Sequence, residues 1–154
     1  MEQGSTNLNK METDKFCYTT AKLLHLSKRV RVDINLAVSF LCTRVVSPTQ
    51  DDKEMLKRVL SYLRGTKNMK RIIGTNYLNY LQPWIDASYA MCRDMRGHMG
   101  GVISMGNGVV IHNCGKQKLN TKSSMESEVK GVSDFFTIHH YIICIVFLES
   151  SGGI

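Results

Sequence analysis

Three carboxylates stand where an acidic side chain could hold a metal ion. Asp86 lies in the strand-like run Trp84–Ser88, and Glu126 and Glu128 lie where a long apolar segment begins. An unpaired carboxylate is costly to bury, so Asp86 must be exposed, be paired or bind a metal ion. Its spacing is compatible with an exposed strand aspartate and with a metal ligand.

Helical geometry separates the two glutamates. Serine and threonine side chains near Ser123 can cap a helix that runs to about Leu148, with both acids close to its positive end. At about 100° per residue, Glu126 lies about 160° from Glu128 around this helix. The residues within about 40° of Glu128 are Val132, Phe135, His139, Ile142 and Val146. The pattern therefore predicts that Glu128 points along the face that packs on a sheet, either as a capping or surface residue or as part of a site.

Basic residues form two groups along the chain. The first group contains Lys57, Arg58, Arg64, Lys67, Lys70 and Arg71, and the second contains Lys116, Lys118 and Lys122. A solvated helix face accounts for the first group. A surface that follows a nucleic-acid backbone accounts for both groups and fits the formal net charge of +7.

The other residues that could carry chemistry give weak patterns. His139, His140 and Cys144 have spacings that two metal ligands on a helix could use, but no second Cys/His pair lies near them. The glycine-rich run Gly97–Gly101 matches neither the P-loop nor the dinucleotide-binding fingerprint. We interpret these residues as ordinary core or turn positions.

Composition indicates a globular intracellular protein. Of the 154 residues, 43% are hydrophobic and 21% are charged, which suits one ordinary domain or two small ones. The five cysteines are scattered without a CxxC pair, so we expect a reducing compartment, either cytoplasm or nucleus. Met1–Lys15 is polar and does not resemble a secretory signal. Phe135–Leu148 is shorter than the roughly 20 residues of a membrane span, so we expect a buried helix and no membrane partner.

The periodicity predicts three helices, then strands, then one long helix. Apolar stripes with helical spacing lie within Phe16–Ser27, from Asp33 to Ser47, and from Thr49 to Gly65, with Asp33 as the cap of the second helix. The strand-like runs are Arg71–Tyr77, Gln82–Tyr89, Gly97–Met105 and Val109–Cys114. Asn107-Gly108 tolerates positive φ at both residues, so we expect the last two runs to form an antiparallel hairpin.

Three ordered blocks of the sequence resemble copia-type retrotransposon Pol polyproteins. The helical block Asp33–Thr66, with Lys57–Thr66 as its clearest part, is similar to the thumb or connection that follows the polymerase core. Asp86–Tyr89 followed by Gly97–Ser104, and then Lys116–Glu128, resemble the start of the ribonuclease H domain. Together the blocks cover about Phe16 to Glu149, and their order is more specific than any one of them.

The resemblance implies a ribonuclease H fold whose carboxylates hold two Mg²⁺ ions, or Mn²⁺ in their place, and cut the RNA strand of an RNA–DNA hybrid. The first carboxylate of that family falls on Asp86, and its helix glutamate falls on Glu128. The DNQSA-like block that carries the third carboxylate is not found after the helix, nor is the polymerase YxDD motif found before it. Because each Mg²⁺ needs several oxygen ligands, two carboxylates predict an incomplete site.

We therefore expect an α+β chain that joins a reverse transcriptase end to half of a ribonuclease H domain. The expected parts are a disordered tail (1–14), a helical thumb- or connection-like segment (15–66), a linker or strand (67–80) and a truncated ribonuclease H-like domain (81–154) with three or four mostly antiparallel strands and one long helix. The expected partners are an RNA–DNA hybrid or other nucleic acid, contacted by both basic groups, and the rest of the polyprotein. The alternatives are a non-catalytic nucleic-acid-binding module and an unstable relic.

Overall fold

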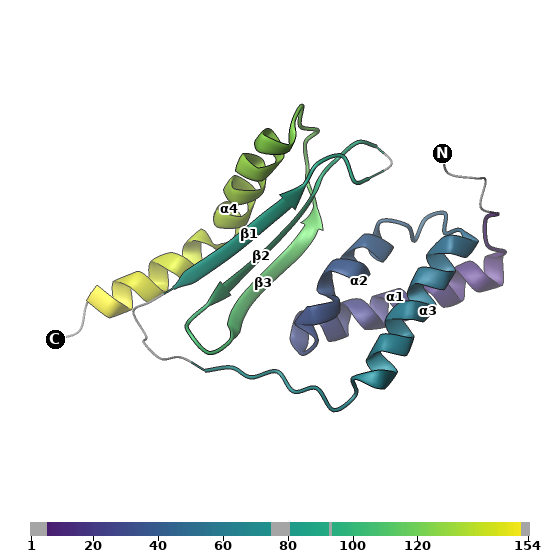
Figure 1. The fold of residues 1–154 in the computed structure, drawn as a ribbon, viewed down its shortest axis with the longest axis horizontal. Coiled ribbons are helices and arrows are strands. Elements are labelled where there is room, and N and C mark those ends of the chain that lie inside the picture. The colour runs from purple at the N-terminus through teal and green to yellow at the C-terminus, as the bar shows by residue number, and fades with distance from the viewer. Residues whose placement is uncertain (1–5, 75–80, 93, 152–154) are drawn as a thin grey trace. The chain divides into compact units, whose positions relative to one another are not determined.

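The α+β class is confirmed by a computed structural model that describes residues 6–74, 81–92 and 94–151. The chain divides into two compact units, an N-terminal unit within Met1–Lys70 and a C-terminal unit within Arg71–Ile154. Helices form the first unit, and a three-stranded sheet with one long helix forms the second (Figure 1).

The N-terminal unit packs its helices around one apolar core. It contains α1 (Lys10–Arg29), the short 3₁₀ helix η1 (Val32–Ile34), α2 (Asn35–Cys42) and α3 (Gln50–Gly65). The buried core residues are Phe16, Leu23, Ile34, Val38, Leu41 and Leu56. The three predicted helices are thus present, and the stripes that were read from their spacing supply most of this core.

Helix α1 begins earlier than its apolar pattern predicted. The Asn9 side chain accepts a hydrogen bond from the backbone N–H of Glu12 at 2.9 Å and caps the helix there. Residues 10–14 therefore belong to α1, and the prediction of a disordered tail as far as residue 14 was wrong for them. The pattern missed this turn because a solvated first turn carries few apolar residues.

Helix α3 begins as predicted. The Thr49 hydroxyl accepts from the backbone N–H of Asp52, and the Asp52 carboxylate accepts from the backbone N–H of Thr49 at 2.9 Å, which is a complete capping box. Leu56 is buried, whereas Leu60 is exposed, so Leu60 does not belong to the core as its spacing suggested.

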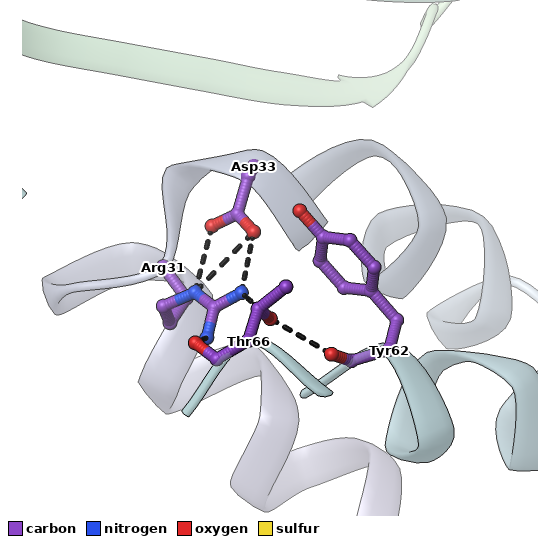
Figure 2. A network of polar contacts seen from close by, with 4 residues as sticks. All are labelled: Arg31, Asp33, Tyr62 and Thr66. Carbon is purple, nitrogen blue, oxygen red and sulfur yellow. Dashed lines mark hydrogen bonds and ion pairs between the residues drawn. The ribbon is translucent and has the colours of Figure 1, made fainter. Parts of the chain in front are cut away.

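Asp33 does not cap the second helix. Residue Ile34 stands at the N-cap of α2 without a side-chain bond, and the Asp33 carboxylate instead accepts from the Arg31 guanidinium at 2.7 and 2.9 Å. The same guanidinium donates to the Thr66 carbonyl oxygen at 3.0 Å and to the Thr66 hydroxyl at 2.6 Å (Figure 2). Arg31 therefore ties the α1–η1 connection to the C-terminal end of α3.

The C-terminal unit contains one antiparallel sheet in the order β1-β2-β3. Its strands are β1 (Gln82–Ser88), β2 (His98–Ser104) and β3 (Val109–Lys116), and they precede α4 (Ser124–Ser151). The strands predicted at 82–89, 97–105 and 109–114 are confirmed, as is the long helix. Residues 71–74 of the first predicted strand, Arg71–Tyr77, have no regular structure, and the remainder of it lies outside the described residues.

The predicted β2–β3 hairpin is confirmed, but its turn works differently. Gly106 takes the positive φ, 112°, whereas neither Asn107 nor Gly108 does. A side chain on Gly108 would overlap the carbonyl oxygen of Ile72, so this glycine is needed for the close approach of the preceding segment. The register shift between Ile103 and Ser104 explains the difference, because a bulge changes which loop residues must turn the chain.

Helix α4 covers one face of the sheet (Figure 1). Phe135 lies fully buried against Gly101, where any side chain would overlap its ring, and the rest of this core is Ala87, Met99 and Ile103. Within the described residues, no helix combines the length and apolar character that a membrane crossing requires.

The Arg31 contact should stabilise the N-terminal unit. We expect Arg31→Met to lower its free energy of unfolding by about 1–3 kcal/mol, because Asp33 and Thr66 lose a buried donor. Hydrogen exchange of α1 and α3 amides in the complete chain measures this. Arg58→Met, which removes an exposed guanidinium from α3, should change exchange by less than about 0.5 kcal/mol. Equal effects of the two variants would contradict the assignment.

The same contact should make the unit sensitive to acid. The hydrogen bonds from Arg31 hold the pKa of Asp33 below its ordinary value of 3.8. A carboxylate whose pKa is lower in the folded state than in the unfolded state stabilises the fold at pH values above its unfolded-state pKa. This stabilisation is lost as the pH falls through its folded-state pKa. Hydrogen exchange should therefore show that the free energy of unfolding of this unit falls between pH 7 and pH values below 4. This decrease should be smaller in Asp33→Asn than in the wild type.

Candidate functional site

Asp86 lies on the open face of the sheet. Its neighbour Ala87 is buried against α4, and successive strand residues point to opposite faces, so the exposed Asp86 points away from α4. Across the strands it pairs with Gly100, which pairs in turn with Cys114. Asp86 is thus an exposed strand aspartate, and its role as a metal ligand stays a prediction.

Glu128 is exposed, whereas Phe135 and His139, which its spacing placed on the same side of α4, are buried. The residues of the first turns that are buried are Ser127 and Gly131, which continue to Phe135 and His139, whereas Val132 is 41% exposed. The small residues Ser127 and Gly131 allow the first turns of the helix to approach the sheet closely. The helical wheel weighted apolar character alone and could not detect a contact made by small residues.

Glu126 has the capping role that Glu128 lacks. Its carboxylate accepts from the backbone N–H of Lys122 at 2.7 Å, and its own N–H donates to the Ser123 hydroxyl at 3.2 Å. Both bonds satisfy groups at the start of α4. Glu126 is therefore part of the helix start and Glu128 is left as an exposed carboxylate one turn into the helix.

The described residues do not offer the donor set that two Mg²⁺ ions need. Among the side chains that the structure describes, no three of His, Cys, Asp or Glu gather closely enough to hold a metal ion. Asp86 and Glu128 are both exposed. The pairing of Asp86 with Glu128 at a metal ion stays a prediction.

A buried polar contact that sequence reasoning missed fastens the start of α4 to the sheet. The Ser127 hydroxyl donates to the carbonyl of Ser88 at 3.2 Å or to the Gln117 side-chain oxygen at 3.0 Å, and the Gln117 side-chain N–H donates to the carbonyl of Ser127 at 2.8 Å. Gln117 and Ser127 are almost completely buried. Gly97 completes the contact: its carbonyl oxygen accepts a hydrogen bond from the backbone N–H of Gln117 at 2.9 Å, and a side chain at Gly97 would overlap the Gln117 side chain.

This contact sits between the two predicted site residues in the sequence. Ser88 lies two residues after Asp86 on β1, and Ser127 directly precedes Glu128 on α4. The sequence signal was the polar pair Gln117 and Ser127 at the end of β3 and the beginning of α4. Such residues look solvated until the tertiary structure shows that they are buried.

The basic residues of the two groups differ in whether they pair with a carboxylate. Lys57, Arg58 and Arg64 are exposed on α3, and Lys118 and Lys122 are exposed between β3 and α4. Lys116 differs, because its ammonium lies 2.6 Å from the Asp94 carboxylate. Lys57 also pairs with Glu54 at 2.6 Å. The exposed residues could meet a phosphate backbone directly, whereas Lys116 must first leave its carboxylate.

The histidines and cysteines make pairwise contacts. The Cys114 sulfur lies 3.6 Å from Nδ1 of the buried His98, and burial lowers the pKa of His98. On α4 the Cys144 sulfur lies 3.6 Å from His140 Nε2, whereas the His139 ring packs 4.7 Å from the Phe135 ring. Pairwise contacts of this kind agree with the interpretation of these residues as core and boundary positions.

The Gly97 contact predicts unequal effects of adding one methyl group at two glycines. Gly97→Ala should lower the free energy of unfolding of the C-terminal unit by about 1–3 kcal/mol, since the methyl group must displace Gln117 or Ser88. Gly115→Ala is the matched control, because its methyl group would meet no atom within 4 Å. Urea unfolding followed by the fluorescence of Trp84 measures both. Equal losses would show that Gly97 is not needed for a close approach.

Comparisons with known proteins find two relatives of this chain. No protein-family model matches the sequence, and no solved structure matches it. An uncharacterized mitochondrial protein of Arabidopsis thaliana is 31% identical over 104 residues, which are 67% of this chain and 43% of that protein. The Retrovirus-related Pol polyprotein from transposon RE1, also from Arabidopsis thaliana, is 30% identical over 105 residues, which are 68% of this chain and 7% of the polyprotein.

The chain spans less than half the length of the first relative and a small part of the second. Similarity to both covers two thirds of its own length, and this agrees with the resemblance that the sequence blocks indicated. The comparisons therefore support a relation of this chain to a segment of a retrotransposon Pol polyprotein.

Proposed function

We propose that the chain is a segment of a copia-type Pol polyprotein that joins the end of the reverse transcriptase to the first half of a ribonuclease H domain. The relation to a retrotransposon Pol polyprotein supports this assignment. The order of elements supports it further, since three helices precede a three-stranded antiparallel sheet and a long helix. In this proposal the N-terminal unit is the thumb- or connection-like part.

The proposed substrate of the complete domain is the RNA strand of an RNA–DNA hybrid, in cytoplasm or nucleus. Asp86 and Glu128 are its proposed carboxylates toward Mg²⁺ or Mn²⁺, and the remaining ligands would come from another segment of the polyprotein. One observation carries the further proposal that this chain does not cleave the hybrid by itself: among its described residues, no three ligating side chains come together. Fewer oxygen ligands than two metal ions need leave the attacking water and the leaving oxygen unassisted.

A cleavage assay tests this proposal. The chain at micromolar concentration with an RNA–DNA hybrid and Mg²⁺ or Mn²⁺ should give no more product than a buffer control. Asp86→Asn is the matched variant, because it keeps the shape of the side chain and removes its charge. Turnover by the wild type that Asp86→Asn abolishes would overturn the proposed inactivity. Turnover that survives in Asp86→Asn would indicate a contaminating nuclease.

A second function, binding of nucleic acid without cleavage, is favoured by the exposed basic residues. Arg58 and Arg64 on α3, and Lys118 and Lys122 before α4, present charged groups to solvent in a chain with a net charge of +7. Cations that meet phosphates release counterions, and this supplies affinity for any sequence. This binding would serve either the complete polyprotein or the segment alone.

Binding of this kind should depend steeply on salt. We expect the affinity for an RNA–DNA hybrid to fall with rising salt, and Lys118→Gln to reduce the slope of log K against log salt by about 0.7–0.9. Its effect should be similar for hybrids of different sequence. Lys15→Gln, which removes the same charge from the exposed face of α1, is the control and should leave the slope nearly unchanged. Fluorescence anisotropy measures the affinities, and a slope near zero would contradict nucleic-acid binding.

A further inference from the structure

The loop between β1 and β2 holds an acidic and a basic side chain in a strained backbone. Its described residues include two non-glycine residues in the left-handed region, Ala90 with φ 53° and Met95 with φ 61°. Backbone hydrogen bonds of 2.9 Å from Cys92 N–H to the Arg96 carbonyl and from Met95 N–H to the Cys92 carbonyl hold this shape. Non-glycine residues in this region are strained, and such strain often accompanies function.

Two cations share one carboxylate at this loop. Asp94 Oδ2 lies 2.6 Å from Lys116 Nζ and 3.3 Å from Arg96 Nε. The three side chains come from the loop and from the end of β3, and they are 44%, 31% and 43% exposed for Asp94, Lys116 and Arg96. The three side chains therefore carry a net charge of +1, and all three are accessible to solvent.

The geometry fits the chemistry of a phosphodiester. A phosphodiester group carries one negative charge on two oxygens, as the Asp94 carboxylate does, and guanidinium and ammonium donors bind both kinds of oxyanion. Exposed ion pairs contribute little to stability, so an incoming phosphate could displace the carboxylate at little cost. Lys116 is also a member of the second basic group, beside the exposed Lys118.

We infer that Arg96 and Lys116 form a phosphodiester-binding site that Asp94 occupies in the free chain, so that a nucleic-acid backbone must displace Asp94 to bind there. The inference deepens the proposed nucleic-acid binding and rests on it. It adds Arg96 as a contact residue and gives Asp94 the role of an internal competitor. The hydrogen bond from Lys116 holds the pKa of Asp94 below its ordinary range, so the competitor is ionised at neutral pH.

Removing the charge of Asp94 tests this competition. Asp94→Asn should bind an RNA–DNA hybrid about two- to fivefold more tightly than the wild type at moderate salt, the range that an exposed ion pair allows. Asp134→Asn is the matched control, since it changes the net charge equally and releases Lys130, its partner at 2.9 Å on α4. It should change the affinity much less. Arg96→Gln should weaken binding, and the double variant Asp94→Asn/Arg96→Gln should lose the gain.

Each outcome decides for or against the inference. An equal gain in Asp94→Asn and Asp134→Asn, or no gain in either, overturns it, because net charge would then explain the affinity. Asp94→Ser, which also removes the charge, must agree with Asp94→Asn. Circular dichroism melting shows whether each variant folds, and if neither Asp94 variant folds, Arg96→Gln decides through its loss of affinity.

A phosphate titration separates this inference from the proposed nucleic-acid binding. If the wild type binds no hybrid, the proposed binding fails, and inorganic phosphate followed by NMR then decides the inference. In Asp94→Asn, phosphate should shift the Arg96 Nε–H and the Lys116 amide at lower concentration than in the wild type and in Asp134→Asn. The absence of such shifts overturns the site.

Discussion

The C-terminal unit depends on one close approach, in which the chain at Gly97 leaves no room for a side chain beside Gln117, Ser88 and Ser127. The polar groups buried there satisfy one another, because Gln117 both donates to and accepts from Ser127. Buried polar groups are costly unless paired, so this contact fixes one position of α4 on the sheet. Apolar packing of Phe135 on the sheet adds stability but specifies position less sharply.

Polar contacts fix the ends of elements in the N-terminal unit as well. Arg31 connects the residues after α1 to Thr66 at the end of α3, while Thr49 and Asp52 satisfy the free N–H groups at its start. The apolar core beneath them is formed by stripes that many packings could bury. In both units, therefore, hydrogen bonds with defined directions select one arrangement from those that apolar burial permits.

The electrostatic character of the chain is set by pairing as much as by composition. The net charge is +7, but Lys116, Lys57 and Lys53 lie within 2.6 Å of carboxylates. A lysine in such a pair can bind another anion only when that anion displaces the carboxylate. The proposed binding of nucleic acid thus combines exposed cations with cations for which a phosphate must compete with a carboxylate.

The α+β class, most helices and strands, the start of the helix at Thr49 and the relation to Pol polyproteins could be predicted from the sequence, because they follow from local periodicity and ordered motifs. The small residues of α4 that pack on the sheet, the partner of Asp33 and the glycine that turns the hairpin became evident only in the folded structure. A helical wheel ranks residues by polarity, yet contact with a sheet is limited by how closely backbones approach. For that reason the small residues Ser127 and Gly131 face inward, although an apolar pattern does not select them.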